Sequence, residues 1–175
     1  MANNYKNTEK AFRAFGDRVV KTARGILNAK GVNTNGNLYD SIGYHLKVYP
    51  SGSMELDFVM EGYGRIVDEG ARGRDSSAKA PRSPYKYGSK MPPVSVIEKW
   101  LKDKGIQARD KSTGRFIKRK QGAYAIAKGI QLYGKEPTYF FRDAFSQAYK
   151  GLSKNIIKAY ARDAEKFLAF VSKEI

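Results

Sequence analysis

The chain has 175 residues, of which 41% are hydrophobic and 13% aromatic, a composition typical of a globular protein with one packed domain. It contains no cysteine and a single histidine, His45, which excludes disulfides, thiolate catalysis, cysteine-ligated zinc and the usual histidine-based triads. The net charge of +16 predicts attraction to nucleic acids or acidic proteins, although a solvated basic face explains it equally well.

The N-terminal ten residues are polar and lack the apolar core of a signal peptide. No stretch of the sequence approaches the run of about 18 apolar residues that a membrane-spanning helix needs. We therefore expect a protein that is soluble, is not exported by the ordinary route and has no contact with a membrane. The absence of cysteine is compatible with folding in a reducing cytosol.

Residues 8–30 are predicted to form an amphipathic helix, because apolar residues recur there at spacings of three and four. Thr8 is the expected N-cap, and Gly31 is expected to end the helix in a left-handed conformation. The residues of the apolar face are Phe12, Phe15, Val19, Val20, Ala23, Ile26 and Leu27. The residues of the opposite face, interpreted as solvated surface, are Arg13, Asp17, Lys21 and Arg24.

A turn-rich stretch, residues 33–37, precedes a predicted β-hairpin. Leu38 and Ile42 fit either one helical turn or the start of a strand. After Gly43 apolar and polar residues alternate, as in half-buried strands, and residues 50–53 are expected to form the hairpin loop. The apolar positions are Tyr44, Leu46, Val48, Met54, Leu56, Phe58 and Met60. His45 falls on the polar side and is interpreted as a surface residue.

The segment Tyr63-Gly64-Arg65-Ile66-Val67-Asp68-Glu69-Gly70 is expected to be an extended crossover, with Gly64 and Gly70 at positive φ where the chain turns. On an extended backbone the carboxylates of Asp68 and Glu69 point to opposite faces, so they are not expected to converge on a substrate. They are interpreted as structural partners of arginines such as Arg65 or Arg72.

Residues 71–93 are predicted to form a long irregular loop that is mobile in isolation, because prolines and glycines interrupt regular structure. Its basic residues are interleaved with Tyr85 and Tyr87, a mixture that suits stacking on a nucleic acid strand or ordering against a neighbouring subunit. We favour the neighbouring subunit. The basic residues are Arg72, Arg74, Lys79, Arg82, Lys86 and Lys90.

Two helices and a hairpin are predicted in the following stretch. The first helix buries a stripe that includes Trp100 as its core anchor, and Gly105 ends it. Residues 106–108 and 115–117 are expected to pair around a glycine-containing turn, and a second helix spans residues 121–133. The remaining members of the first stripe are Val94, Ile97 and Leu101.

From residue 139 almost to the C-terminus, an apolar stripe predicts one long helix with Thr138 or Pro137 near its N-cap. A helix of about 30 residues would reach roughly 45 Å, which is longer than a domain of this size needs. Its far end, about residues 151–175, is therefore expected to project, to kink near Gly151 or to pack on another chain.

The sequence shows no phosphate-binding loop, serine-nucleophile elbow or zinc motif. The acidic residues that a metal-dependent nuclease would need are Asp57, Glu61, Asp68 and Glu69. We expect no lysine close to them on the adjacent strand. The protein is therefore expected to have no enzymatic activity, no cofactor and no bound metal.

Several motifs follow one another in a recognisable order. They are Gly36-Asn37-Leu38-Tyr39-Asp40-Ser41-Ile42, the segment from Tyr63 to Gly70, Ile97-Glu98-Lys99-Trp100-Leu101, Lys104-Gly105-Ile106, Ala125-Ile126-Ala127-Lys128-Gly129-Ile130 and Pro137-Thr138-Tyr139-Phe140-Phe141-Arg142-Asp143-Ala144. In this order they resemble the tailed-bacteriophage neck or tail-completion proteins, which join the head-side connector to the tail. The residues that match this family's structural signatures are Tyr63, Glu69, Gly70, Pro137, Phe140, Phe141, Arg142 and Ala144. The basic loop of residues 71–90, the basic hairpin near Lys118 and the long C-terminal helix depart from the family's pattern.

The resemblance implies an α+β subunit in which a small antiparallel sheet packs against a long N-terminal helix and further helices. It implies a structural virion protein, assembled in the host cytoplasm into a homo-oligomeric ring in the neck around the DNA channel, between connector-side and tail-side proteins. Subunit or partner contacts are then expected at Tyr63, Glu69, Gly70, Arg72, Arg74, Arg82, Tyr85, Tyr87, Phe140, Phe141 and Arg142. Contacts with DNA in the channel or with acidic neighbours are expected at Arg115, Lys118, Arg119 and Lys120.

Two other classes stay open on the residues alone. A free basic nucleic-acid-binding protein would bind as a monomer, with an affinity that falls steeply as salt rises. A metal-dependent nuclease would cut in the presence of magnesium and would be inactivated by Asp57→Ala or Glu69→Ala.

Overall fold

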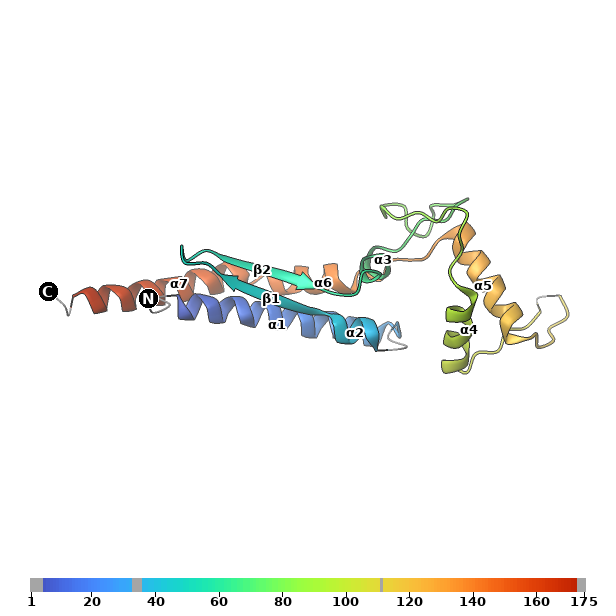
Figure 1. Ribbon diagram of the computed structural model, residues 1–175, viewed down its shortest axis with the longest axis horizontal. Coiled ribbons are helices and arrows are strands. Elements are labelled where there is room, and N and C mark those ends of the chain that lie inside the picture. Colours follow the sequence, from blue (N-terminus) through green and yellow to red (C-terminus); the bar gives the residue numbers. More distant parts are fainter. Residues whose placement is uncertain (1–4, 33–35, 111, 173–175) are drawn as a thin grey trace. The chain divides into compact units, whose positions relative to one another are not determined.

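The computed structural model describes residues 5–32, 36–110 and 112–172 and has the predicted α+β fold (Figure 1). The elements are α1 (Lys6–Ala29), α2 (Asn37–Ser41), β1 (Gly43–Val48), β2 (Met54–Val59), α3 (Gly64–Glu69), α4 (Val94–Asp103), α5 (Arg119–Tyr133), α6 (Phe140–Tyr149) and α7 (Leu152–Val171). The chain divides into two compact units, which we call the terminal unit (Met1–Glu61 with Phe140–Ile175) and the central unit (Gly62–Tyr139).

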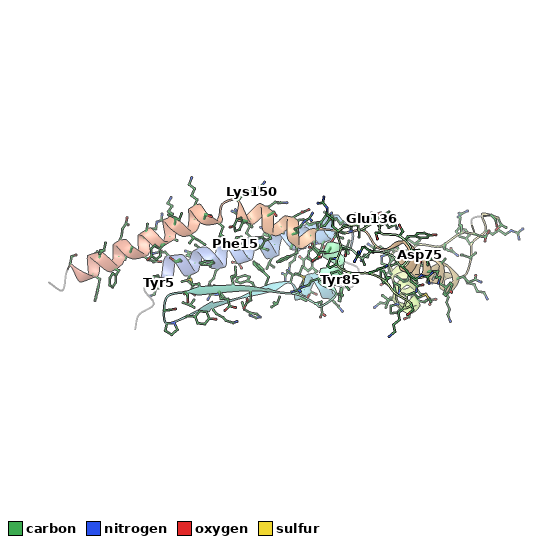
Figure 2. The ribbon with its side chains drawn as sticks, turned by 90° about the horizontal axis from the view of Figure 1, so that it is seen from above. Tyr5, Phe15, Asp75, Tyr85, Glu136 and Lys150 are labelled. Carbon is green, nitrogen blue, oxygen red and sulfur yellow. The ribbon has the colours of Figure 1, made fainter. Side chains whose placement is uncertain are left out.

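The terminal unit is built around α1, which contacts the β-hairpin and the helices α6 and α7 (Figures 1 and 2). The predicted apolar face of α1 is its buried face: Val19, Ala23 and Leu27 are almost inaccessible to solvent. The helix ends as expected, because Gly31 adopts a φ of 62° and the amide of Val32 donates to the Leu27 carbonyl. Residues 33–35, which belong to the turn-rich stretch predicted after this helix, lie outside the described residues.

The start of α1 differs from the prediction. The N-cap position is Tyr5, and Thr8 lies inside the helix with its side chain buried. The amide and hydroxyl of Thr8 each donate a 2.8 Å hydrogen bond to Oδ2 of Asp163 in α7. The amide and side-chain nitrogen of Asn7 donate to Oδ1 of the same carboxylate. A carboxylate brought in from α7 therefore satisfies the free N–H groups that a local cap was expected to satisfy.

The hairpin forms as predicted, with β1 and β2 antiparallel and Tyr44 opposite Phe58. Leu38 belongs to a short helix, since α2 spans Asn37–Ser41, whereas Ile42 follows that helix in an extended conformation directly before β1. The loop of residues 50–53 is closed by a hydrogen bond from the Tyr49 amide to the Ser53 carbonyl. His45 is exposed, as expected.

Aromatic rings fill the space between the hairpin, α1 and α6. Phe58 of β2 makes edge contacts with Phe15, Phe141 and Phe145, at centroid distances of 5.4 to 6.1 Å. Phe15 is 7% exposed and forms a core with Val19 and Ala148. Gly16 lets the sheet approach α1 closely, because a Cβ there would lie 2.7 Å from the Tyr44 ring.

Two residues that were interpreted as solvated surface of α1 have structural partners. The Arg24 guanidinium donates to the carbonyls of Tyr39 and Ile42, which closes the C-terminal end of α2. Asp17 accepts a 2.9 Å hydrogen bond from the Tyr44 hydroxyl. Both interactions join residues of α1 to partners at least 15 residues later in the chain, and helical periodicity alone does not reveal them.

The long C-terminal helix is divided in two. α6 ends at Tyr149 and α7 begins at Leu152, so the expected kink near Gly151 is a complete break. Thr138, which was expected near the N-cap, lies two residues before the first residue of α6, and its hydroxyl donates to the Val67 carbonyl inside the central unit. The last turns of α7 extend beyond the N-terminal end of α1 (Figure 1).

In the central unit, the expected extended crossover is a short helix, α3. Gly64 is part of this helix and not a positive-φ turn, whereas Gly70 does adopt a φ of 72° and ends it. The amides of Thr138 and Tyr139 donate to the carbonyls of Val67 and Asp68, so a segment distant in sequence satisfies the end of α3. That partner makes a helix possible in so short a segment.

The helices α4 and α5 pack on each other and end at the expected glycines, Gly105 and Gly134. The core anchor is Leu101, which is fully buried; Trp100, the predicted anchor, is only partly buried. Between the two helices the described residues of the expected hairpin form an antiparallel bridge of Arg109 with Phe116, and the Ile117 amide donates to the Ala108 carbonyl.

The loop of residues 71–93 has no helix or strand, as predicted, but backbone hydrogen bonds fix its course. Ala71 pairs with Lys135 in both directions, and the amides of Arg74 and Asp75 donate to the carbonyls of Gln131 and Leu132 at the end of α5. The side chain of Gln131 returns hydrogen bonds to the carbonyls of Gly88 and Ser89. The loop is thus fastened to the C-terminal end of α5.

Candidate functional site

The structure separates the predicted contact residues into several surfaces. The first is the basic tip, which we define as residues 109–110 and 112–120, from the segment after α4 into the first turn of α5. Arg115, Lys118, Arg119 and Lys120 are all exposed there, as the sequence predicts. Arg109 lies over the ring of Phe116, 4.0 Å from its centroid, and Phe116 itself is 56% exposed. The basic tip therefore combines dense positive charge with an accessible aromatic ring.

The turn of the basic tip is held by Asp110. Its Oδ1 accepts hydrogen bonds from the hydroxyls and amides of Ser112 and Thr113. These bonds, led by that from the Ser112 hydroxyl, lower the pKa of Asp110 to about 2. The carboxylate stays charged at neutral pH and is committed to shaping the turn.

The second surface is the loop of residues 71–93, where Arg72 pairs with the segment that carries Tyr85 and Tyr87. Its amide donates to the Tyr85 carbonyl, and its carbonyl accepts from the Tyr87 amide. The Arg72 Nε is buried with no hydrogen-bond partner among the described residues, so this nitrogen does not serve the predicted pairing with Asp68 or Glu69. Burial raises the pKa of the Tyr87 hydroxyl. Burial also lowers the pKa of the side chain of Lys135, whose backbone pairs with Ala71 of the loop.

The other predicted partner contacts differ in accessibility. Arg74 and Arg142 are exposed and lie beside the carboxylates of Asp75 and Asp143. Phe140 is fully buried, so it is not available to a partner and acts as a core residue. The remaining positions divide as follows: Tyr63 and Arg82 are exposed, Glu69, Tyr85 and Phe141 are partly buried, and Gly70 is buried.

The third surface is the apolar end of α7, which we define as Phe167, Leu168 and Phe170. These side chains are 50%, 66% and 59% exposed. They follow Asp163, the residue at which α7 meets the first turn of α1. The sequence predicted a projecting helix here. In the structure the last turns of this helix carry large apolar side chains that are exposed to solvent.

Across the described ranges, no group of three or more histidine, aspartate or glutamate side chains is arranged to hold a metal ion. The expectation that no lysine lies near Asp57 is wrong, because Nζ of Lys47 on the adjacent strand is 3.0 Å from its Oδ2. That pair is diagonal across the hairpin and exposed, and it is a surface ion pair.

The sequence analysis did not predict the fourth feature, a groove between α1 and α7 with a volume of about 390 Å³. Two helices that lie more than a hundred residues apart in the chain form its walls. Its lining residues are Asn7, Lys10, Ala11, Ala14, Phe15, Arg18, Ala148, Leu152, Asn155, Lys158, Ala159 and Arg162. Only the recurrence of basic residues at every fourth position of α7 hinted at it.

Comparison with known proteins gives no relative: no protein-family model, curated protein or solved structure matches the chain. None of the helices in the described part of the chain combines the length and the apolarity that crossing a bilayer demands.

Proposed function

We propose that this protein is a structural component of the bacteriophage head–tail junction, and that its copies assemble into a ring in the neck that joins the connector to the tail around the DNA channel. The proposal starts from the order of motifs in the sequence. The observation that carries it is the apolar end of α7, where Phe167, Leu168 and Phe170 are at least half exposed.

Burying a side chain of this kind contributes roughly 1.5–3 kcal/mol, so three neighbouring ones supply a substantial association energy. Contiguous apolar patches on a soluble protein typically mark an interaction site. A second copy of the chain is the occupant we propose. When a surface on one copy meets a different surface on the next, the interface is head-to-tail, and such interfaces give rings where the rotation between copies closes and filaments where it does not.

The basic residues of α7 precede its apolar end. Lys154, Lys158, Arg162 and Lys166 recur every four residues and therefore run along one side of the helix. Phe170 continues this row beyond Lys166, so apolar side chains take the place of the charge at the end of α7, and copies can approach there without bringing all their charge together.

Light scattering after size exclusion, followed by negative-stain electron microscopy, tests the proposal. The native protein is expected to form rings, and the double variant Leu168→Ser with Phe167→Ser is expected to be monomeric. Val96→Ser is the matched control, because Val96 is 57% exposed on α4 and its loss should leave assembly unchanged. A native protein that stays monomeric at every concentration, or a double variant that still forms rings, would contradict the proposal.

Two observations outside the purified protein bear on the same proposal. The neck assignment predicts a gene beside portal, terminase and tail genes, and predicts the polypeptide among the proteins of purified virions by mass spectrometry. Its absence from assembled particles would exclude the neck.

The second candidate is a free basic nucleic-acid-binding protein, which the exposed Phe116 and its stacked Arg109 favour. An aromatic ring among cations suits a single strand, since bases stack on the ring while the cations neutralise phosphates. This function predicts salt-sensitive binding of an oligonucleotide by the monomer, abolished by Phe116→Ala with Arg115→Glu.

A further inference from the structure

The groove between α1 and α7 has a charged rim and an apolar floor. The cations of the rim come from both helices: Lys10 and Arg18 from α1, and Lys158 and Arg162 from α7. All four are exposed. The floor is made of small or buried apolar side chains. They are Ala11, Ala14, Phe15, Ala148, Leu152 and Ala159.

The described residues that line the groove include no carboxylate. The nearest in sequence to Arg162 is Asp163, which is buried and occupied by four hydrogen bonds from the first turn of α1. The ion pairs described in the terminal unit involve other cations. They are Arg13 with Glu9, Lys47 with Asp57 and Glu55, and Arg142 with Asp143. The four rim cations thus concentrate a positive potential that an anionic partner would relieve.

The floor indicates which kind of anionic partner fits. Alanines at the contact let a third helix approach two helices closely, because interhelical distance depends on the side chains between them. A single nucleic acid strand binds through accessible rings on which bases stack, and Phe15, the one ring among the described lining residues, is 7% exposed and engaged in the core. An apolar floor between charged walls matches a helix with one apolar and two acidic faces.

We propose that this groove docks an acidic amphipathic helix of another protein, with the apolar face of that helix on the alanine floor and its carboxylates against the rim cations. The partner is a different chain, because no described helix of this protein has an acidic face: α5, for example, contains no aspartate or glutamate. This inference does not rest on ring assembly, and the groove lies within one unit of a single subunit.

The probe is a synthetic helical peptide of about 18 residues, or five turns, with leucine and alanine on one face and glutamate on the others. Fluorescence anisotropy measures its binding to the full chain. The same peptide with glutamine in place of glutamate, and a double-stranded DNA oligonucleotide of similar charge, are the competitor ligands.

Three variants locate the binding. Lys158→Glu with Arg162→Glu reverses two rim charges and is expected to weaken binding at least about tenfold. Lys150→Glu with Lys154→Glu makes the same change of net charge on neighbouring exposed residues outside the groove lining, and is expected to change affinity less than about twofold. Ala14→Trp fills the groove at an exposed position without changing charge and is expected to weaken binding as strongly as the rim variant.

Amide NMR shifts that map the peptide to α1 and α7 would complete the support. Equal losses from the two charge-reversal variants would overturn the proposal in favour of diffuse attraction. Binding of the DNA but not the peptide, with the same sensitivity to the rim variant, would replace it with a nucleic-acid site. Failure of the peptide to bind at all would also overturn it, and would leave the ring proposal untouched, since that is tested by the apolar end of α7.

Discussion

The two units of the chain are stabilised in different ways. The terminal unit buries side chains: the rings of Phe15, Phe58 and Phe145 meet edge to face between helix and hairpin. The central unit relies on backbone contact, in which the loop of residues 71–93 is hydrogen-bonded to the end of α5 and to Lys135. A side-chain core tolerates substitutions that conserve volume, whereas a glycine in direct contact with another backbone segment cannot be replaced by a residue with a Cβ.

The largest loss is expected from Phe15→Ala in the terminal unit. Removing a ring that is 7% exposed leaves a cavity against Phe58 and Phe145, and such truncations cost about 3–5 kcal/mol. Hydrogen exchange should show the loss in the amides of α1, the hairpin and α6. Phe15→Leu is the control, with a loss less than half as large. Equal stability of Phe15→Ala and the native protein would show that the aromatic cluster does not hold this unit together.

The matching test in the central unit is Gly73→Ala. A Cβ at residue 73 would collide with the Leu132 carbonyl, so we expect a loss of about 3 kcal/mol and rapid exchange in the amides that fasten the loop. Gly88→Ala is the matched control in the same loop, because nothing lies within 4 Å of a Cβ there. If both variants are equally stable, the loop is not held by backbone contact as described.

A smaller, pH-dependent effect is expected from Asp163, which joins α7 to the start of α1. Burial would raise the pKa of Asp163, but hydrogen bonds from Thr8 and Asn7 outweigh burial and lower it. A lowered folded pKa means that the carboxylate stabilises the fold above its unfolded pKa of about 4, and that this contribution is lost as pH falls through the folded pKa.

Asp163→Ala is therefore expected to cost about 2 kcal/mol near neutral pH, because the donors of Asn7 and Thr8 lose their acceptor. Thermal unfolding of native protein and Asp163→Asn, followed from about pH 6 to pH 2, provides the check. The difference in melting temperature should shrink as the pH falls. A difference that stays constant over this range would mean that charge plays no part in the cap.

Local patterns were sufficient for the elements whose residues interact with near neighbours. Helical spacing located α1, α4 and α5, alternation located β1 and β2, and glycine chemistry located the ends at Gly31, Gly105 and Gly134. The exposure of the basic tip followed in the same way, because clustered cations such as Lys118 and Arg119 have no favourable buried state without partners.

The tertiary structure decided what depends on partners distant in the chain. The segment Tyr63–Gly70 is helical because residues 138 and 139 satisfy its carbonyls, and Thr8 needs no local cap because Asp163, 155 residues away, supplies the acceptor. The groove between α1 and α7 has the same origin. Sequence spacing reports only interactions within a few residues, so long-range hydrogen bonds and surfaces shared by two distant helices become visible only once the chain has folded.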